Sequence, residues 1–321
     1  MSIESIFESI KSGNLITKQE AMTLTLYPTN DLCHYANLIC KHFCKNEFDL
    51  CSITNGKSGK CSEDCKYCAQ SVHNHTNIEC YSLRNNSSLQ RDGLYNNAKG
   101  VARFSIVTSG RSLSDAEIEN LSKTYGSLKR LSKLGLCASH GLLSKSQLQI
   151  LKNSGVTRYH NNLETSRKFF PSICTTHSYD EKISTIKDAQ DIGLEVCSGG
   201  IFGLGENYED RIDLALTLRS LNIKSVPINF LNPIEGTPLA HLKPLSEDEI
   251  KKSVAIMRFI LPDAFLRLAG GRGLLPNLGH DLFECGINAS LTGDLLTTPG
   301  ISIDCDLEKI KSLNLEVKRY D

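Results

Sequence analysis

Short apolar runs alternate with amphipathic stretches through most of this chain, and that alternation restricts the folds open to it. Amphipathic stretches with an apolar period of about 3.6 separate most of the runs, for example at 143–153 and 179–192. Strand–helix repeats of this kind favour parallel strands joined by helical crossovers. Eight of them predict an α/β fold that is a single (β/α)8 TIM-type barrel. The expected strands are 48–53, 103–108, 134–139, 158–161, 194–199, 225–230, 265–269 and 286–291.

The segment before the first run has a helical pattern. Within 32–43, apolar side chains recur at the spacing of one helix face. We therefore divide the chain into an N-terminal helical segment (1–47), a barrel (48–300) and a C-terminal tail or helix (301–321). The chemistry of such barrels lies at the C-terminal ends of the strands, so we expect site residues there.

Charge and composition exclude several function classes. The chain has 36 Lys and Arg and 36 Asp and Glu, so its formal net charge is zero. That balance gives no basic footprint for nucleic acid or for an anionic membrane surface. Residues 1–14 are polar, and no later run is long enough to span a membrane, so we expect a cytoplasmic protein. Thirteen cysteines in such a chain indicate metal ligation or buried thiols rather than a disulfide framework.

Three of these cysteines form a motif just after the first expected strand. Cys61, Cys65 and Cys68 have the spacing C-x3-C-x2-C. Three thiolates on one loop can hold three corners of a [4Fe–4S] cluster and leave the fourth iron open to a small molecule. A structural zinc loop or unligated thiols are the alternatives. Zinc fits less well, because its usual ligands come as two separated pairs.

The triplet, with Tyr67 just before its last cysteine, resembles the radical S-adenosylmethionine (SAM) superfamily. The stretches 161–166, 196–206, 226–229, 267–272 and 295–299 resemble the biotin synthase family and follow in that family's order. The resemblance implies a barrel with an N-terminal helical extension, a [4Fe–4S] cluster and SAM. It also implies a sulfurtransferase that converts dethiobiotin to biotin. A 5′-deoxyadenosyl radical would abstract hydrogens from two unactivated carbons, and an auxiliary Fe–S cluster would supply the sulfur. A flavodoxin or ferredoxin reductant and a homodimer are implied as well.

The same resemblance assigns residues to SAM. Tyr67 would lie beside the adenine, although loop packing explains it equally well. Glu164 matches a family Asp that holds the ribose hydroxyls, and His177 stands where the family often has an Arg for the SAM carboxylate. Gly199 and Gly200 would let the backbone approach SAM closely. Their surroundings lack the order of a dinucleotide fingerprint and the Lys of a phosphate loop, which excludes nucleotide-phosphate binding.

Two amides are implied to bind the substrate. Asn162 and Asn229 would hydrogen-bond the ureido ring of dethiobiotin, and capping or loop solvation is the alternative. An amide offers a donor and an acceptor together, which suits a cyclic urea.

A second cysteine set is implied to hold the auxiliary cluster. Its family ligands match Cys137, Cys197 and Arg267. The family has a further cysteine where this chain has Ser105, and a hydroxyl is a poorer ligand for iron than a thiolate. This departure counts against an ordinary [2Fe–2S] cluster.

Cys51 is a candidate replacement. Barrel interiors are built in layers of four side chains drawn from alternate strands. Cys51, Cys137, Cys197 and Arg267 fall on expected strands one, three, five and seven. We hypothesise that Cys51 takes over from Ser105 and gives a three-cysteine site, which holds either [2Fe–2S] or a larger, sulfide-bearing cluster. In this respect the chain resembles the variant subset of the biotin synthase family that is found in anaerobes. The alternative is that Cys51 fills space as a buried thiol.

The other seven cysteines are assigned no metal-binding role, and two rival functions remain open. Cys33, Cys40 and Cys44 share one helix face and are expected to be core thiols, whereas no family ligand matches Cys80, Cys174, Cys285 or Cys305. Another radical SAM enzyme of this barrel type, resembling a hydrogenase maturase or a methylornithine synthase, is the first rival. A non-enzymatic Fe–S electron carrier is the second, but it would need four ligands per cluster.

Overall fold

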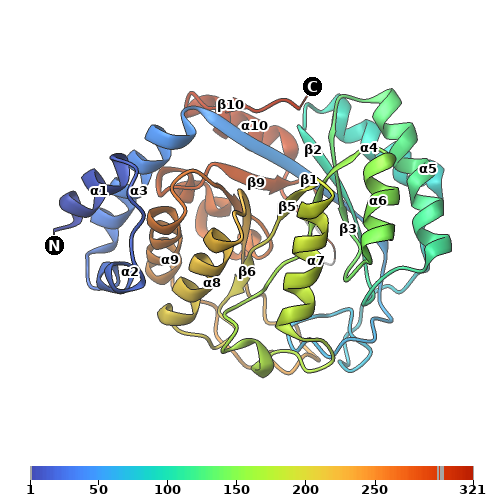
Figure 1. The fold of residues 1–321 in the computed structure, drawn as a ribbon, viewed down its shortest axis with the longest axis horizontal. Helices are drawn as coiled ribbons and strands as arrows, with labels where there is room; N and C mark the ends of the chain where they lie inside the picture. The colour runs from blue at the N-terminus through green and yellow to red at the C-terminus, as the bar shows by residue number, and fades with distance from the viewer. Residues whose placement is uncertain (1, 295, 297–299, 321) are drawn as a thin grey trace.

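The computed structural model describes residues 2–294, 296 and 300–320, and its centre is a closed parallel barrel (Figure 1). Each neighbouring pair of strands is parallel, and the last strand pairs back with the first. The predicted (β/α)8 architecture is therefore confirmed. In spatial order the strands are β1 (Glu47–Lys57), β2 (Arg103–Thr108), β3 (Gly135–Ser139), β4 (Val156–His160), β5 (Glu195–Cys197), β7 (Ser225–Phe230), β8 (Phe265–Leu268) and β9 (Ala289–Thr292).

One expected strand is interrupted. The run 194–199 ends as β5 at Cys197, and a separate strand β6 (Gly200–Phe202) then pairs with β7. A Cβ at Gly199 would lie 1.9 Å from the carbonyl oxygen of Pro227, so only glycine lets the chain pass β7 here. β5 and β6 together fill one of the eight strand positions.

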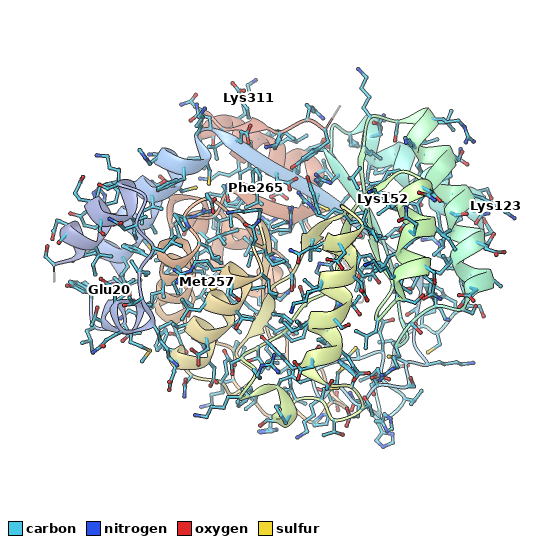
Figure 2. The ribbon with its side chains drawn as sticks, in the orientation of Figure 1. Glu20, Lys123, Lys152, Met257, Phe265 and Lys311 are labelled. Atoms are coloured by element: carbon cyan, nitrogen blue, oxygen red, sulfur yellow. A yellow bond between two sulfur atoms is a disulfide. The ribbon has the colours of Figure 1, made fainter. Side chains whose placement is uncertain are left out.

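Helices cover the outside of the barrel (Figure 1). Four of them begin with a capping box, in which a Ser or Asn side chain and the third helical residue satisfy each other's backbone N–H groups. Met257 is buried on its helix, whereas Lys123 and Lys311 are exposed (Figure 2). The helices are α4 (Asn86–Ala98), α5 (Asp115–Leu131), α6 (Lys145–Asn153), α7 (Tyr179–Asp191), α8 (Tyr208–Ser220) and α9 (Glu247–Ile260).

The first residues form helices α1 (Ile3–Lys11), α2 (Lys18–Leu24) and α3 (Thr29–Cys44), and α3 packs against α9. One prediction is wrong here. Cys33 is not a free core thiol but is joined to Cys285 in a disulfide, with Cα atoms 4.2 Å apart across 252 residues of sequence. The pairing follows from the docking of α3 beside the turn after η3 (Pro276–Glu284), which helical periodicity does not reveal.

The last described residues close the opposite side of the barrel from the cysteine loop. Helix α10 (Ile303–Ser312) leads to β10 (Glu316–Val317), which pairs with the start of β1 (Figure 1). The ring of Tyr320 then lies over the Arg103 guanidinium, 3.5 Å from it. The motif at 295–299, apart from Leu296, lies outside the described residues. Within the described chain, no helix combines the length and apolar character needed to cross a membrane.

Candidate functional site

A cavity of about 450 Å³ lies inside the barrel and extends to the C-terminal ends of the strands. Both cysteine sets reach it, together with the predicted substrate amides. Cys65, His177, Gly199 and Gly200 are not part of its wall. The predicted site residues that line it are Cys51, Cys61, Tyr67, Cys68, Ser105, Cys137, Asn162, Glu164, Cys197, Asn229 and Arg267.

The cysteine loop is fixed by its own backbone. The N–H of Cys61 donates to the carbonyl of Gln70 at 3.0 Å, and the N–H of Cys68 donates to that of Cys65 at 3.1 Å. The amide of Asn74 donates to the carbonyls of both Cys65 and Cys68. The loop therefore presents its thiols in a set arrangement. Within the described chain, the one group of metal-ligand side chains whose ligand atoms all lie within 4.8 Å of one another contains Cys65 but neither Cys61 nor Cys68.

Two carboxylates inside the loop attach it to the segment before α7. Asp64 accepts hydrogen bonds from the N–H groups of Thr175 at 2.8 Å and Thr176 at 3.2 Å. Burial acts to raise the pKa of Asp64, but the hydrogen bonds from Thr175 outweigh it and hold the pKa below its usual range. Glu63 accepts from the Thr176 hydroxyl at 2.9 Å and from Arg111 at 3.3 Å. The loop is thus held on its outer side by negative charge.

Cys174 and His177 lie beside Cys65. The Sγ atoms of Cys65 and Cys174 are 3.7 Å apart, and Cys174 Sγ is 3.3 Å from His177 Nδ1. That nitrogen is also 2.5 Å from Glu63 Oε2. His177 therefore faces Glu63 and Cys174, and its predicted contact with the SAM carboxylate stays a prediction. Sequence reasoning missed Cys174, although the spacing Cys-x2-His at 174–177 is one that metal ligands use.

The second cysteine set meets deep in the barrel. The neighbouring Cys137 thiol raises the pKa of Cys51, and the Cys51 thiol lowers the pKa of Cys137 to about 6. Cys197 Sγ accepts from the Ser225 hydroxyl at 3.2 Å. Strands β1, β3, β5 and β8, which carry this set, are alternate strands of the barrel. The structure therefore brings Cys51 level with the predicted ligands.

A buried charge cluster lies beneath these thiols. Asp49 is fully buried, and its Oδ2 is 2.6 Å from Arg267 and 2.9 Å from Arg158, with Arg103 at 3.8 Å. Burial acts to raise the pKa of Asp49, but the guanidinium of Arg267 and its neighbours hold it well below the usual range. Glu195, whose side chain is 56% exposed, also pairs with Arg103 and Arg158 at 3.0 Å. Three guanidiniums against two carboxylates leave this floor with one net positive charge, which suits thiolates.

Sequence reasoning missed Arg103, Arg158 and Asp49, and two arginines inside apolar strand runs were the available signal. Arg103 also reaches the cysteine set directly, because its Nη1 is 3.8 Å from Cys137 Sγ. Ser105 lies in register with Cys137, and its buried hydroxyl has no hydrogen-bond partner within the described chain.

The predicted substrate and SAM residues have partners in the barrel. Asn162 Oδ1 accepts from the N–H of Gly199 at 3.0 Å, and Asn229 donates to the carbonyl of Gly200 at 3.0 Å. A Cβ at Gly200 would meet the carbonyl oxygen of Glu164 at 2.3 Å, so protein packing alone requires both glycines. Glu164 has φ 71°, and its buried Oε2 has no partner within the described chain, which leaves it free to accept from a ligand hydroxyl.

Family models match two parts of the chain. Residues 57–218 match the radical SAM superfamily, and residues 227–316 match the biotin and thiamin synthesis associated domain. A biotin synthase of Clostridium botulinum (strain Hall) is 54% identical over 310 residues, covering 97% of this chain and 98% of that protein. A biotin synthase of Akkermansia muciniphila is 50% identical over 314 residues, covering 98% of each.

Solved structures share the fold. A methylornithine synthase superposes with a TM-score of 0.84 at 17% identity, covering 98% of this chain and 97% of that one. A maturase of the FeFe-hydrogenase gives 0.83 at 17% identity, covering 99% of this chain and 75% of that one. At such low identity the likeness concerns the fold alone.

Proposed function

The chain belongs to the biotin synthase family of radical SAM enzymes, and from that premise we propose how its two cysteine sets divide the work. The family implies a [4Fe–4S] cluster and SAM, with dethiobiotin as the substrate. We propose that this chain converts dethiobiotin to biotin in the barrel cavity. The observation that carries the proposal is that two cysteines of the loop, Cys61 and Cys68, line one cavity together with the deep cysteines and with Asn162 and Asn229.

The loop is proposed to hold the first cluster. Cys61, Cys65 and Cys68 would each supply a thiolate, because three thiolates on one loop can hold three corners of such a cluster. When bound, the clusters and SAM supply hydrogen abstraction at two unactivated carbons and the sulfur that joins them. The protein's own residues position these groups and exclude water.

Residues at the mouth of the cavity are proposed to orient SAM and substrate. Glu164 has an unpartnered buried oxygen that can accept from the ribose hydroxyls. Tyr67 lines the same wall and offers an aromatic face to adenine. Asn162 and Asn229 are fixed by backbone hydrogen bonds, so they can meet the ureido ring without reorganising. Asn162 would offer its Nδ2, and Asn229, whose Oδ1 and Nδ2 both have backbone partners, would use its second N–H and second lone pair.

The deep set is proposed to hold the auxiliary cluster. Cys51, Cys137 and Cys197 would be its thiolate ligands, and the positive floor would balance their charge. Arg267 donates to Asp49, and that carboxylate raises the pKa of Arg267 against the effect of burial. We therefore propose that Arg267 stabilises the cluster as a cation. Three thiolates without a fourth suit a sulfide-bearing cluster better than the ordinary [2Fe–2S] form.

The proposal is tested with anaerobically reconstituted protein given SAM, dethiobiotin and a flavodoxin reductant. Mass spectrometry should detect biotin together with 5′-deoxyadenosine. Mössbauer spectra with iron and sulfide counts should show a second cluster beside [4Fe–4S]. Formation of 5′-deoxyadenosine without biotin, with only one [4Fe–4S] signal, would contradict a sulfur source in this barrel.

Three further expectations also remain proposals. We propose flavodoxin or ferredoxin as the reductant, a homodimer, and a cytoplasmic location. Light scattering during size-exclusion chromatography decides the oligomeric state. Comparing product formation with each reduced carrier decides the reductant.

A further inference from the structure

A group of metal-ligand side chains lies beside the cysteine loop. Cys65, Cys174 and His177 offer two sulfurs and an imidazole nitrogen that all lie within 4.8 Å of one another. Cys174 is 3% exposed and the side chain of His177 is 7% exposed. The biotin synthase reaction proposed above uses only Cys65 of the three as an iron ligand.

The spacing of these atoms matches a tetrahedral zinc ion. Bonds of about 2.3 Å to sulfur and about 2.0 Å to nitrogen put two sulfur ligands about 3.8 Å apart, and a sulfur and a nitrogen about 3.5 Å apart. The Sγ atoms of Cys65 and Cys174 are 3.7 Å apart. Cys174 Sγ is 3.8 Å from His177 Nε2. The Nδ1 of the same ring is nearer to Cys174 Sγ, at 3.3 Å, so the imidazole has to shift for Nε2 to face the ion. The ligand atoms, all within 4.8 Å of one another, can then close on it.

The histidine is already oriented for such a bond. His177 Nδ1 lies 2.5 Å from Glu63 Oε2, so the carboxylate fixes the proton on Nδ1 and leaves Nε2 as the metal-binding atom. A histidine that donates its other N–H to a carboxylate is the usual second contact at zinc sites. Glu63 is held in turn by Arg111 and by Thr176.

The charges also balance. Two thiolates neutralise one Zn²⁺, the imidazole is neutral, and Glu63 is paired with Arg111. A neutral buried site avoids the cost of an unpaired charge.

We propose that the cluster-free chain binds one Zn²⁺ through Cys65 Sγ, Cys174 Sγ and His177 Nε2, with water as the fourth ligand. The two thiol protons are released to solvent. Because Cys65 cannot serve both, zinc and the [4Fe–4S] cluster compete for the loop. Zinc at this site keeps the loop folded but blocks assembly of the cluster.

Cobalt titration of cluster-free protein tests the site, because Co²⁺ reports thiolate ligands by absorption. The wild type should bind one Co²⁺ with thiolate-to-cobalt bands that one equivalent of Zn²⁺ removes. Cys174→Ser should lose these bands. The double variant Cys61→Ser/Cys68→Ser should keep them, and that result separates this site from simple binding by the triplet.

Glu63→Gln should weaken binding about 10- to 100-fold. The exposed Cys80→Ser is the matched control and should behave as wild type.

Bands that disappear in the double variant and persist in Cys174→Ser would overturn the site. Circular dichroism checks that each variant is folded. A second readout is the rate of [4Fe–4S] assembly after one equivalent of Zn²⁺: it should fall in the wild type and stay unchanged in Cys174→Ser. Equal slowing in both would contradict competition at Cys65. Loss of cobalt binding together with normal biotin formation would contradict the zinc site but not the proposed function. Normal cobalt binding without biotin formation would contradict the proposed function but not the zinc site.

Discussion

The two cysteine sets are built in different ways. Cys61, Cys65 and Cys68 lie within one short loop, are partly exposed, and are fixed by hydrogen bonds inside that loop. Cys51 and Cys197 are buried, and they come together only because the barrel closes. A site made by one local segment can be recognised from the spacing of its cysteines in the sequence. A site made by closure of the barrel depends on the whole fold.

The electrostatic surroundings differ in sign. Glu63 and Asp64 place carboxylates behind the loop, while Arg103, Arg158 and Arg267 place guanidiniums beneath the deep set. Asp49, at the centre of the deep floor, is also fully buried. The deep site should therefore tolerate substitution less well than the loop.

Removing the central carboxylate should have the largest effect. Asp49→Asn removes the carboxylate that pairs with the buried Arg267, while Arg103 and Arg158 keep their ion pairs with Glu195. We expect a loss of about 3–5 kcal/mol in the free energy of unfolding, because the Arg267 charge is left buried without its partner. Urea denaturation measures it. The exposed Asp304, which pairs with Lys99 at 3.0 Å, gives the control Asp304→Asn, with an expected loss of less than about 1 kcal/mol. Equal small losses would show that the floor does not organise the barrel.

Removing one deep thiol should abolish one cluster and spare the other. In Cys51→Ser the auxiliary Mössbauer signal should vanish while the [4Fe–4S] signal of the loop remains, because the two sets share no ligand. Cys61→Ser should give the opposite pattern. Cys40→Ser, at a buried thiol of α3, is the control. An unchanged auxiliary signal in Cys51→Ser would return Cys51 to the role of a space-filling thiol.

The deep cavity should also make stability fall in mild acid. Burial lowers the pKa of His160 to about 4, whereas the unfolded chain has the ordinary value of about 6.5. Between these values only the unfolded chain binds the proton, so stability falls as the pH drops, by up to about 1.4 kcal/mol per pH unit. His160→Gln should lessen this slope. Above pH 7, the dependence of stability on pH should be little changed by the substitution. The exposed His42→Gln should keep the slope, and identical slopes in all three proteins would argue against a neutral His160.

The smallest expected effect on stability is at Tyr320, whose ring covers Arg103 in the deep floor. Tyr320→Ala removes the stack on Arg103 and should cost about 1–2 kcal/mol by thermal or urea unfolding. Tyr320→Phe should match the wild type within about 0.5 kcal/mol, because it keeps the ring that lies over the Arg103 guanidinium. A loss in Tyr320→Phe as large as in Tyr320→Ala would show that the hydroxyl matters more than the ring.

The same contrast explains what could be predicted from the sequence. The strands 103–108 and 225–230 were predicted to the residue, because apolar runs and turns are local signals. The loop triplet was found by spacing alone. The Cys33–Cys285 disulfide was not found, and neither was the approach of Cys174 to Cys65, because both pair segments more than a hundred residues apart. The break between β5 and β6 depends on contact with Pro227, which no local pattern reports.

The position of Tyr320 has a consequence for the order in which the molecule is made. During synthesis the chain emerges from its N-terminus, and early parts begin to fold first. The loop with Cys61–Cys68 can form its own hydrogen bonds while later strands are still missing. The floor under the deep set cannot be finished until β10 has paired with β1 and the ring has settled on Arg103. If the deep set holds the proposed auxiliary cluster, its loading into a closed barrel has to wait until translation of the chain has passed its last strand.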